Sequence, residues 1–211
     1  DTSDNNIRYT WDGDLVGGKA VFLGSAGTVT IDASVDIAGI AFQASGYTIG
    51  SGTINLLQSG CNVSSATGSA TISSALVGSG GLTKLGTGTL TLSGANAYSG
   101  GTTVEAGTLS VSGNGSVGTG DVAINAGTLQ LSGTGSVEMG DVYVAGGGTL
   151  RFSRSGTTYF DAAISGSGAI TQTSGTVVVR GDSDAYGGTI TISNSSATLQ
   201  VGDGGTTGTL G

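Results

Sequence analysis

The sequence predicts an all-β protein in which short parallel strands stack into a solenoid, on the order of nine coils of roughly 20 residues each. A five-residue pattern of Gly or Ala, Thr, Leu or Val, any residue and a second apolar residue occurs six times. The copies are GTLTL (88–92), GTLSV (107–111), GTLQL (127–131), GTLRF (148–152), GTVVV (175–179) and ATLQV (197–201). Their threonines are 19 to 27 residues apart, and repetition at such a period is typical of stacked repeats.

The spacing of apolar residues inside each copy indicates strands rather than helices. Leu90 and Leu92 are two residues apart, so both side chains face one side of a strand while Thr91 faces the other. One copy is too short to close a core of its own. Stacking the copies buries the apolar side continuously, which is how a solenoid is stabilised.

A second strand recurs in the middle of the chain. Residues 115–131 align with 135–152, and the Gly-Asp-Val step recurs at Asp121 and Asp141, twenty residues apart. We therefore expect the following side chains to face inward with Leu129 and Leu150: Val122, Ile124, Val142 and Val144. In the segment GGTITIS, Ile190 and Ile192 resemble Val104 in GGTTVEA, which predicts that they occupy corresponding strands.

Composition favours an ordered chain with few charged residues. Gly accounts for 43 of 211 residues and Pro for none, and we assign the glycines to the bends between strands. The chain has 14 acidic and 6 basic residues, a net charge of −8, which argues against nucleic acid or an anionic membrane as a partner. It has no His and one Cys, so neither an intramolecular disulfide nor a His-dependent triad can form, and we expect no metal or cofactor.

The chain reads as one domain, 1–211, with a cap region at 1–27 and stacked coils over 28–211. Its polar start contains no signal peptide or membrane anchor, and 202–211 begins a further turn and stops. We therefore expect a mature or trimmed fragment that ends within a repeat. Residues 59–75 are irregular, and the sequence does not assign them to a coil.

Three segments resemble a known family. Residues 78–109, GSGGLTKLGTGTLTLSGANAYSGGTTVEAGTL, resemble the autotransporter-associated β-strand repeat of type V secretion passenger domains, and 166–199 resembles a second, looser copy. The opening TWDGD (10–14) with 28–56 is similar to the start of such passengers. The resemblance implies a right-handed parallel β-helix, exported across the inner membrane and then across the outer membrane by a carboxy-terminal β-barrel translocator, which this chain does not include.

The family implies a delivery route more directly than an activity. We expect a non-enzymatic rod, on the bacterial surface or secreted, that acts in adhesion or self-association. Its partners would be host-cell surface molecules or glycans, or identical passengers on neighbouring cells. The alternative is a soluble host-directed ligand or a glycan-binding or glycan-active β-helix that uses a local patch.

Paired carboxylates are the candidates for chemistry, because β-helical polysaccharide enzymes need clustered acids or calcium. The pairs are Asp121 with Asp141, Asp182 with Asp184, and Asp32 with Asp36. We interpret each pair as bend residues that bond to local backbone. The tandem GGxGxD motif of calcium β-rolls is absent, and we predict neither metal binding nor catalysis.

The candidate binding residues are the outward side chains that depart from small polar types. The pattern predicts one outward row: Thr91, Ser110, Gln130, Arg151, Val178 and Gln200. Tyr143, Arg151, Arg154 and Tyr159 stand out from it, because Tyr and Arg are enriched at binding hot spots. We expect these four to project outward from consecutive coils, within reach of one another. Since Tyr159 and Phe160 are adjacent, one of the two must point inward.

Overall fold

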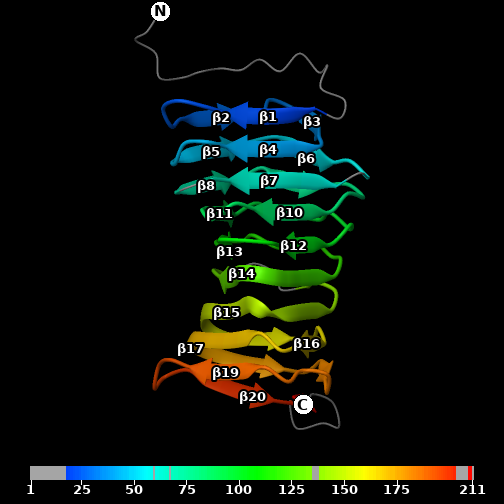
Figure 1. Ribbon diagram of the computed structural model, residues 1–211, viewed down its shortest axis with the longest axis vertical. Helices are drawn as coiled ribbons and strands as arrows, with labels where there is room; N and C mark the ends of the chain where they lie inside the picture. Colours follow the sequence, from blue (N-terminus) through cyan, green and yellow to red (C-terminus); the bar gives the residue numbers. More distant parts are fainter. Residues whose placement is uncertain (1–17, 59, 67, 135–137, 203–208, 211) are drawn as a thin grey trace, which may run out of the picture.

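Stacked parallel strands run the length of the molecule, in the order of the sequence (Figure 1). The structure, a computed structural model, describes residues 18–58, 60–66, 68–134, 138–202 and 209–210. These residues contain no helix, and the strands form a parallel β-solenoid of about nine turns. The predicted all-β solenoid is thereby confirmed.

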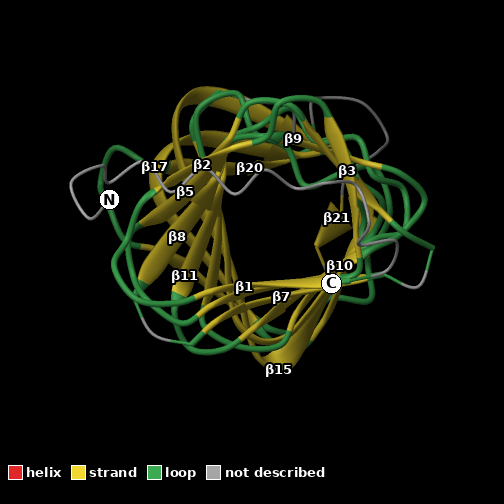
Figure 2. Ribbon diagram, turned by 90° about the horizontal axis from the view of Figure 1, so that it is seen from above, coloured by secondary structure: helices red, strands yellow, loops and turns green. Residues whose placement is uncertain are grey.

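Each coil has three sides, which we call sides A, B and C in chain order. Side A carries β1 (Lys19–Phe22), β4 (Gly39–Phe42), β7 (Cys61–Ser65), β10 (Leu82–Leu85), β12 (Thr102–Val104) and β16 (Ile164–Gly166). Side B carries β2 (Thr28–Thr30), β5 (Tyr47–Gly50), β8 (Ser69–Ile72), β11 (Thr89–Leu92), β13 (Thr108–Val111) and β19 (Thr189–Ile192). Side C carries β3 (Ser34–Ile37), β6 (Thr53–Leu56), β9 (Ala75–Val77) and β20 (Thr198–Val201). Figure 2 shows these sides along the stack, with β1, β7 and β10 together and β5, β8 and β11 together.

Three long strands continue around the corners of the coil. β14 (Val122–Ser132) covers sides A and B, β15 (Val142–Phe160) covers all three sides, and β17 (Ala169–Val179) covers sides B and C. A short pair, β18 (Asp182–Ser183) with β21 (Thr209–Leu210), follows them. The later coils are therefore held by nearly continuous ladders of backbone hydrogen bonds.

The core is a set of apolar columns that run along the stack. Leu90 pairs in register with Leu109, Leu109 with Leu129, and Leu129 with Leu150. Each of these four side chains is fully buried. The valines and isoleucine predicted to face inward from β14 and β15 are buried as well. Each leucine packs on its neighbours above and below, so one core serves all coils.

The glycines that open three of the six repeats adopt a backbone conformation that favours glycine. Gly107 and Gly127 adopt φ values of 66° and 83°, a region that L-residues with a side chain rarely occupy. A Cβ on Gly107 would also collide with the carbonyl oxygen of Gly88 in the preceding coil. The Gly-Thr step is therefore a corner of the coil followed by a strand.

The register corrects the predicted row of six repeats. Thr89, Thr108, Thr128 and Thr149 align on side B, but the next residue in that row is Ala169. Thr176 and Thr198 lie on side C, beneath Thr157. The prediction that all six copies share one row is wrong, because a glycine corner followed by a strand fits any side of the coil. The interval of 27 residues spans one coil and one additional side.

The register also changes the assignment of Ile190 and assigns residues that the sequence left unassigned. Ile190 pairs with Ile170 on side B, so the prediction that it corresponds to Val104 of side A is wrong. Residues 60–66 and 68–75, which the sequence left unassigned, contribute β7, β8 and the first residue of β9 to a regular coil. The stack also includes β1, which pairs with β4 from Lys19 onward.

Side C of the central coils is held by side chains as well as by backbone. The backbone N–H of Leu76 donates to Oδ1 of Asn96 (2.9 Å), and Nδ2 of Asn96 donates to the carbonyl oxygen of Ser116 (2.7 Å). The Tyr98 hydroxyl, fully buried, lies 2.7 Å from Oγ1 of Thr102. These bonds explain the Asn and Tyr of the segment GANAYSGG, since both replace a regular strand at this side.

Polar side chains also fill two corners from inside. Lys84 is fully buried, and its Nζ donates to the carbonyl oxygens of Leu85 (2.9 Å), Gly86 (2.8 Å) and Ala106 (3.2 Å). Burial lowers the pKa of the Lys84 ammonium to about 8. Gln172 occupies the next corner, where its Nε2 donates to the carbonyl oxygen of Gly175 (2.8 Å). Each side chain satisfies carbonyls that the bend removes from the ladder.

Candidate functional site

Two hollows lie next to each other where side C turns into side A. One, of about 610 Å³, is lined by residues that include Asp121, Asp141 and Tyr143. The other, of about 550 Å³, is lined by residues that include Met139, Asp141 and Tyr159. Asp141 belongs to both, so the two hollows flank one ridge of the coil.

Tyr143 stands on the side A flank of this ridge. It is an outward residue of β15 between Ala123 and Ser165 in register, and 49 % of it is exposed. A Cβ on Gly166 would lie 3.1 Å from Cε2 of the Tyr143 ring. The ring therefore leans over Gly166 of the next coil, and the small neighbours leave the hollow open.

Tyr159 stands on the side C flank. It lies near the end of β15 and is 51 % exposed. Cζ of Arg180 lies 4.6 Å from the centroid of the Tyr159 ring. Arg180 is held by Asp161 through two hydrogen bonds, Nε to Oδ1 (2.5 Å) and Nη2 to Oδ2 (2.7 Å). This geometry is a cation–π contact whose cation is fixed by a bidentate carboxylate.

The paired aspartates bond to the backbone at bends. Oδ1 of Asp121 accepts the backbone N–H of Asp141 (3.0 Å), and Oδ1 of Asp141 accepts the backbone N–H of Ala163 (3.2 Å). Asp36 contradicts the bend interpretation, since it lies within β3 and accepts a bond from the side-chain Nδ2 of Asn55 in the next coil (2.7 Å). Within the described ranges, no group of three or more Cys, Asp or Glu could hold a metal ion. Asp121 and Asp141 thus have structural roles at the corners of successive coils.

The four predicted binding residues all belong to β15 and not to consecutive coils. Tyr143 lies on side A, Arg151 on side B and Tyr159 on side C. The predicted outward position of Arg154 is wrong, since only 9 % of it is exposed, at the corner between sides B and C. Burial lowers its pKa. The structure brings Tyr143 and Tyr159 to one ridge and places Arg151 on another side.

The residues of the predicted outward row lie on two different sides of the coil. Thr91, Ser110, Gln130 and Arg151 align on side B as expected. Val178 and Gln200 align instead with Tyr159 on side C, and the predicted outward position of Val178 is wrong because only 3 % of it is exposed. Sequence reasoning therefore missed Arg180 and Asp161 as neighbours of Tyr159. Their separation of 19 residues, about one coil, was the signal that could have paired them.

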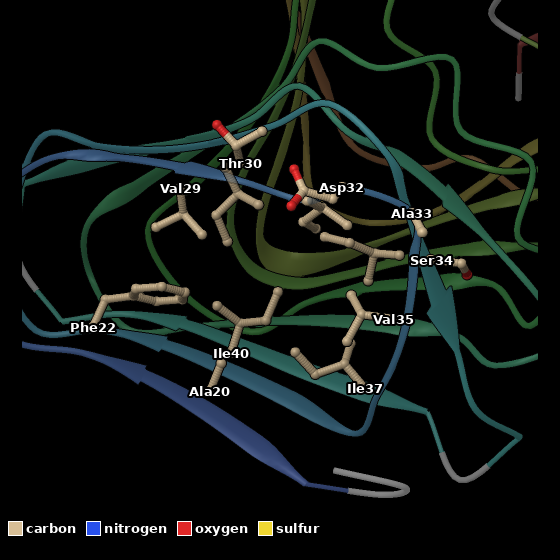
Figure 3. Close-up of a pocket in the computed structure, with 13 residues that line it drawn as sticks. Ala20, Phe22, Val29, Thr30, Asp32, Ala33, Ser34, Val35, Ile37 and Ile40 are labelled. Atoms are coloured by element: carbon tan, nitrogen blue, oxygen red, sulfur yellow. The ribbon is translucent and has the colours of Figure 1, made fainter. Parts of the chain in front are cut away.

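A more enclosed cavity, of about 170 Å³, lies at the first two coils (Figure 3). Its lining is largely apolar and includes Phe22, Val29 and Ile40. The Phe22 ring stacks on Phe42 at 5.2 Å between centroids. This cavity lies at the end of the core column formed by the first described coils.

Comparisons with known proteins agree with this architecture. A family model for the passenger-associated-transport-repeat matches residues 82–111, which include β10 to β13. Over 67 residues the chain is 36 % identical to the "Adhesin BmaC autotransporter" of Brucella suis biovar 1 (strain 1330), covering 32 % of this chain and 2 % of that protein. No solved structure matches the chain. These findings confirm the resemblance to an autotransporter passenger with repeats.

Proposed function

We propose that the chain is a non-enzymatic segment of a secreted autotransporter passenger, a rod that acts in adhesion or self-association at the bacterial surface. The observation that carries this proposal is the outward surface of side B, which we call the hydroxyl face. Its two rows are Ser69, Thr89, Thr108, Thr128, Thr149, Ala169 and Thr189, and Thr28, Thr48, Thr71, Thr91, Ser110, Gln130, Arg151, Thr171 and Thr191.

The chemistry of the hydroxyl face suits a long, distributed contact. Arg151 is the one charged residue in the two rows, so two rods can approach side by side with little charge repulsion. Threonine side chains are stiff about χ1, and ordering them at a contact costs little entropy. Each position adds little energy, and the total grows with the number of coils in contact.

The route to the surface follows from the family. An autotransporter passenger crosses the outer membrane with its own β-barrel translocator, and we propose that partner for this chain. Coil-by-coil stacking suits such export, because each emerging coil can pack on the one already folded. The described residues contain no helix long and apolar enough to span a membrane. The partners proposed for the exposed rod are host-cell surface molecules or glycans, or identical rods on neighbouring cells.

Removal of one coil tests this proposal. Val111 pairs with Leu131 in register, so deletion of residues 111–130 joins equivalent positions and shortens the rod by one coil. We expect weaker clumping of cells that display the shortened passenger, and only a slight loss from Arg151→Ala. Complete loss from Arg151→Ala, with no effect of the deletion, would contradict a distributed contact.

A further inference from the structure

We propose that the ridge between Tyr143 and Tyr159 is a binding site for a neutral oligosaccharide, which we call the corner site. It comprises Met139, Asp141, Tyr143, Tyr159, Asp161 and Arg180. The corner site narrows one of the partners proposed above, a glycan, to neutral oligosaccharides. It does not rest on the hydroxyl face, because that face lies on side B whereas the corner site lies between sides C and A.

The aromatic rings supply the contact surface for a sugar. The faces of aromatic rings carry partial negative charge, and the C–H groups on one face of a pyranose ring are weakly positive, so the two stack. Tyr143 and Tyr159 are each about half exposed, at 49 % and 51 %. They are the two exposed aromatic side chains of the described residues, and both stand beside the same ridge.

The Tyr159 ring is held in place before any ligand arrives. Arg180 lies against the ring at 4.6 Å from its centroid and is itself fixed by two bonds to Asp161. A ring that is already ordered loses little side-chain entropy on binding. The ring of Tyr143 also lies close to the next coil, over Gly166.

Carboxylates at the same ridge provide acceptors for sugar hydroxyls. Asp141 lines both hollows, and Asp161 lines the hollow beside Tyr159. Hydrogen bonds to an ionised carboxylate are stronger than those between neutral groups. Rings on two sides of one ridge with an acceptor between them fit a chain of sugars better than a single monosaccharide.

The charge at the corner selects against acidic sugars. Asp121, Glu138, Asp141 and Asp161 line the two hollows, whereas the nearby cation, Arg180, is paired with Asp161. A sialylated or sulfated glycan would therefore meet like charge. The hollows, at about 550 and 610 Å³, are within the usual size of small-ligand sites.

The test uses short soluble neutral oligosaccharides and their sialylated counterparts, first on a glycan array and then by calorimetric titration of the whole chain. We expect neutral oligosaccharides to bind and sialylated ones to bind more weakly. Tyr159→Ala and Tyr143→Ala should each weaken binding about tenfold or more. Tyr159→Phe, which keeps the stacking face, should stay within about threefold of the parent.

Gln130→Ala, an outward change on side B of the adjacent coil, is the matched control and should leave saccharide binding unchanged. Circular dichroism melting of each variant verifies that the fold is retained, and Tyr143→Ala provides an independent reading if Tyr159→Ala unfolds. Absence of binding by every neutral oligosaccharide, binding confined to acidic glycans, or binding unaffected by both tyrosine changes would overturn the corner site. Cell clumping is a separate measurement, so failure of saccharide binding would overturn the corner site without testing the hydroxyl face.

Discussion

The guanidinium of Arg180 lies over the ring of Tyr159, although 21 residues separate the two in the chain. Tyr159 lies next to the last residue of β15, and Arg180 directly follows β17, the paired strand of the next coil. The same step of one coil connects Asp161 to Arg180 and Asp121 to Asp141. Side-chain contacts in this rod therefore join neighbouring coils, and local changes are felt by the coils on either side.

Leu129→Asp should strongly destabilise the rod. Leu129 is fully buried between Leu109 and Leu150, so the change places a charge in a core that three coils share. We expect a loss of about 3–5 kcal/mol in the free energy of unfolding, measured by denaturant titration. Gln130→Asp, the outward neighbour, is the control and should change stability by about 0.5 kcal/mol or less. Equal stability of the Leu129 variant and the parent would contradict the shared core.

Lys84 should make stability rise with pH just above pH 8. Its pKa is lowered to about 8 in the folded chain from an ordinary value of 10.5, so over that interval the unfolded state holds more protons than the folded state. Lys84→Met removes this contribution. The free energy of unfolding of the parent should rise relative to that of the variant by about 1 kcal/mol between pH 8 and pH 9.

Comparison of the two proteins isolates Lys84 from other titrating groups. Burial raises the pKa of the Cys61 thiol to about 12, so its contribution to stability falls as pH rises above the ordinary value of 9.0 in both proteins alike. A difference between parent and variant that does not change with pH would show that the pKa of Lys84 is not lowered in the folded chain.

The double change Asp121→Asn with Asp141→Asn should leave stability within about 1 kcal/mol of the parent. An amide oxygen can still accept the backbone N–H groups of Asp141 and Ala163, and the repulsion between stacked carboxylates disappears. Addition of millimolar calcium should not change the melting temperature of the parent. A rise of several degrees with calcium that is absent in the double variant would instead indicate a cation site.

Much of the fold can be predicted from periodic patterns in the sequence. The alternation of Leu90 and Leu92 predicts a strand with one buried side, and a period near 20 predicts the stack. The side that a repeat occupies could not be predicted, because the Gly-Thr corner at Gly175 has the same local chemistry as the one at Gly107. Only the register of whole coils distinguishes side B from side C.

The residue types of the candidate site could be predicted from the sequence, but the sides of the coil on which they lie could not. Tyr143 and Tyr159 stand out in a surface of small polar residues, and both are exposed. The GTVVV copy that contains Val178 has the same pattern as the side B repeats, so the pattern does not predict that Val178 aligns with Tyr159 or that Arg180 lies nearby. Arg154 is buried because the alternation along β15 continues past Arg151 and places Arg154 on the same face as Phe152; the outward expectation for Arg154 did not apply this period of two.

The central claim, that the hydroxyl face carries adhesion between rods, is tested most directly by moving two charges from one side of the same coils to another. Thr71→Glu with Thr91→Glu places them on side B, and Asn62→Glu with Thr83→Glu places them on side A of the same two coils. Both variants have equal net charge, and clumping of cells that display each passenger is measured beside the parent. We predict severalfold weaker clumping for the side B variant, because like charges would face each other across the contact, and clumping near that of the parent for the side A variant. Equal clumping of the two variants would contradict the claim.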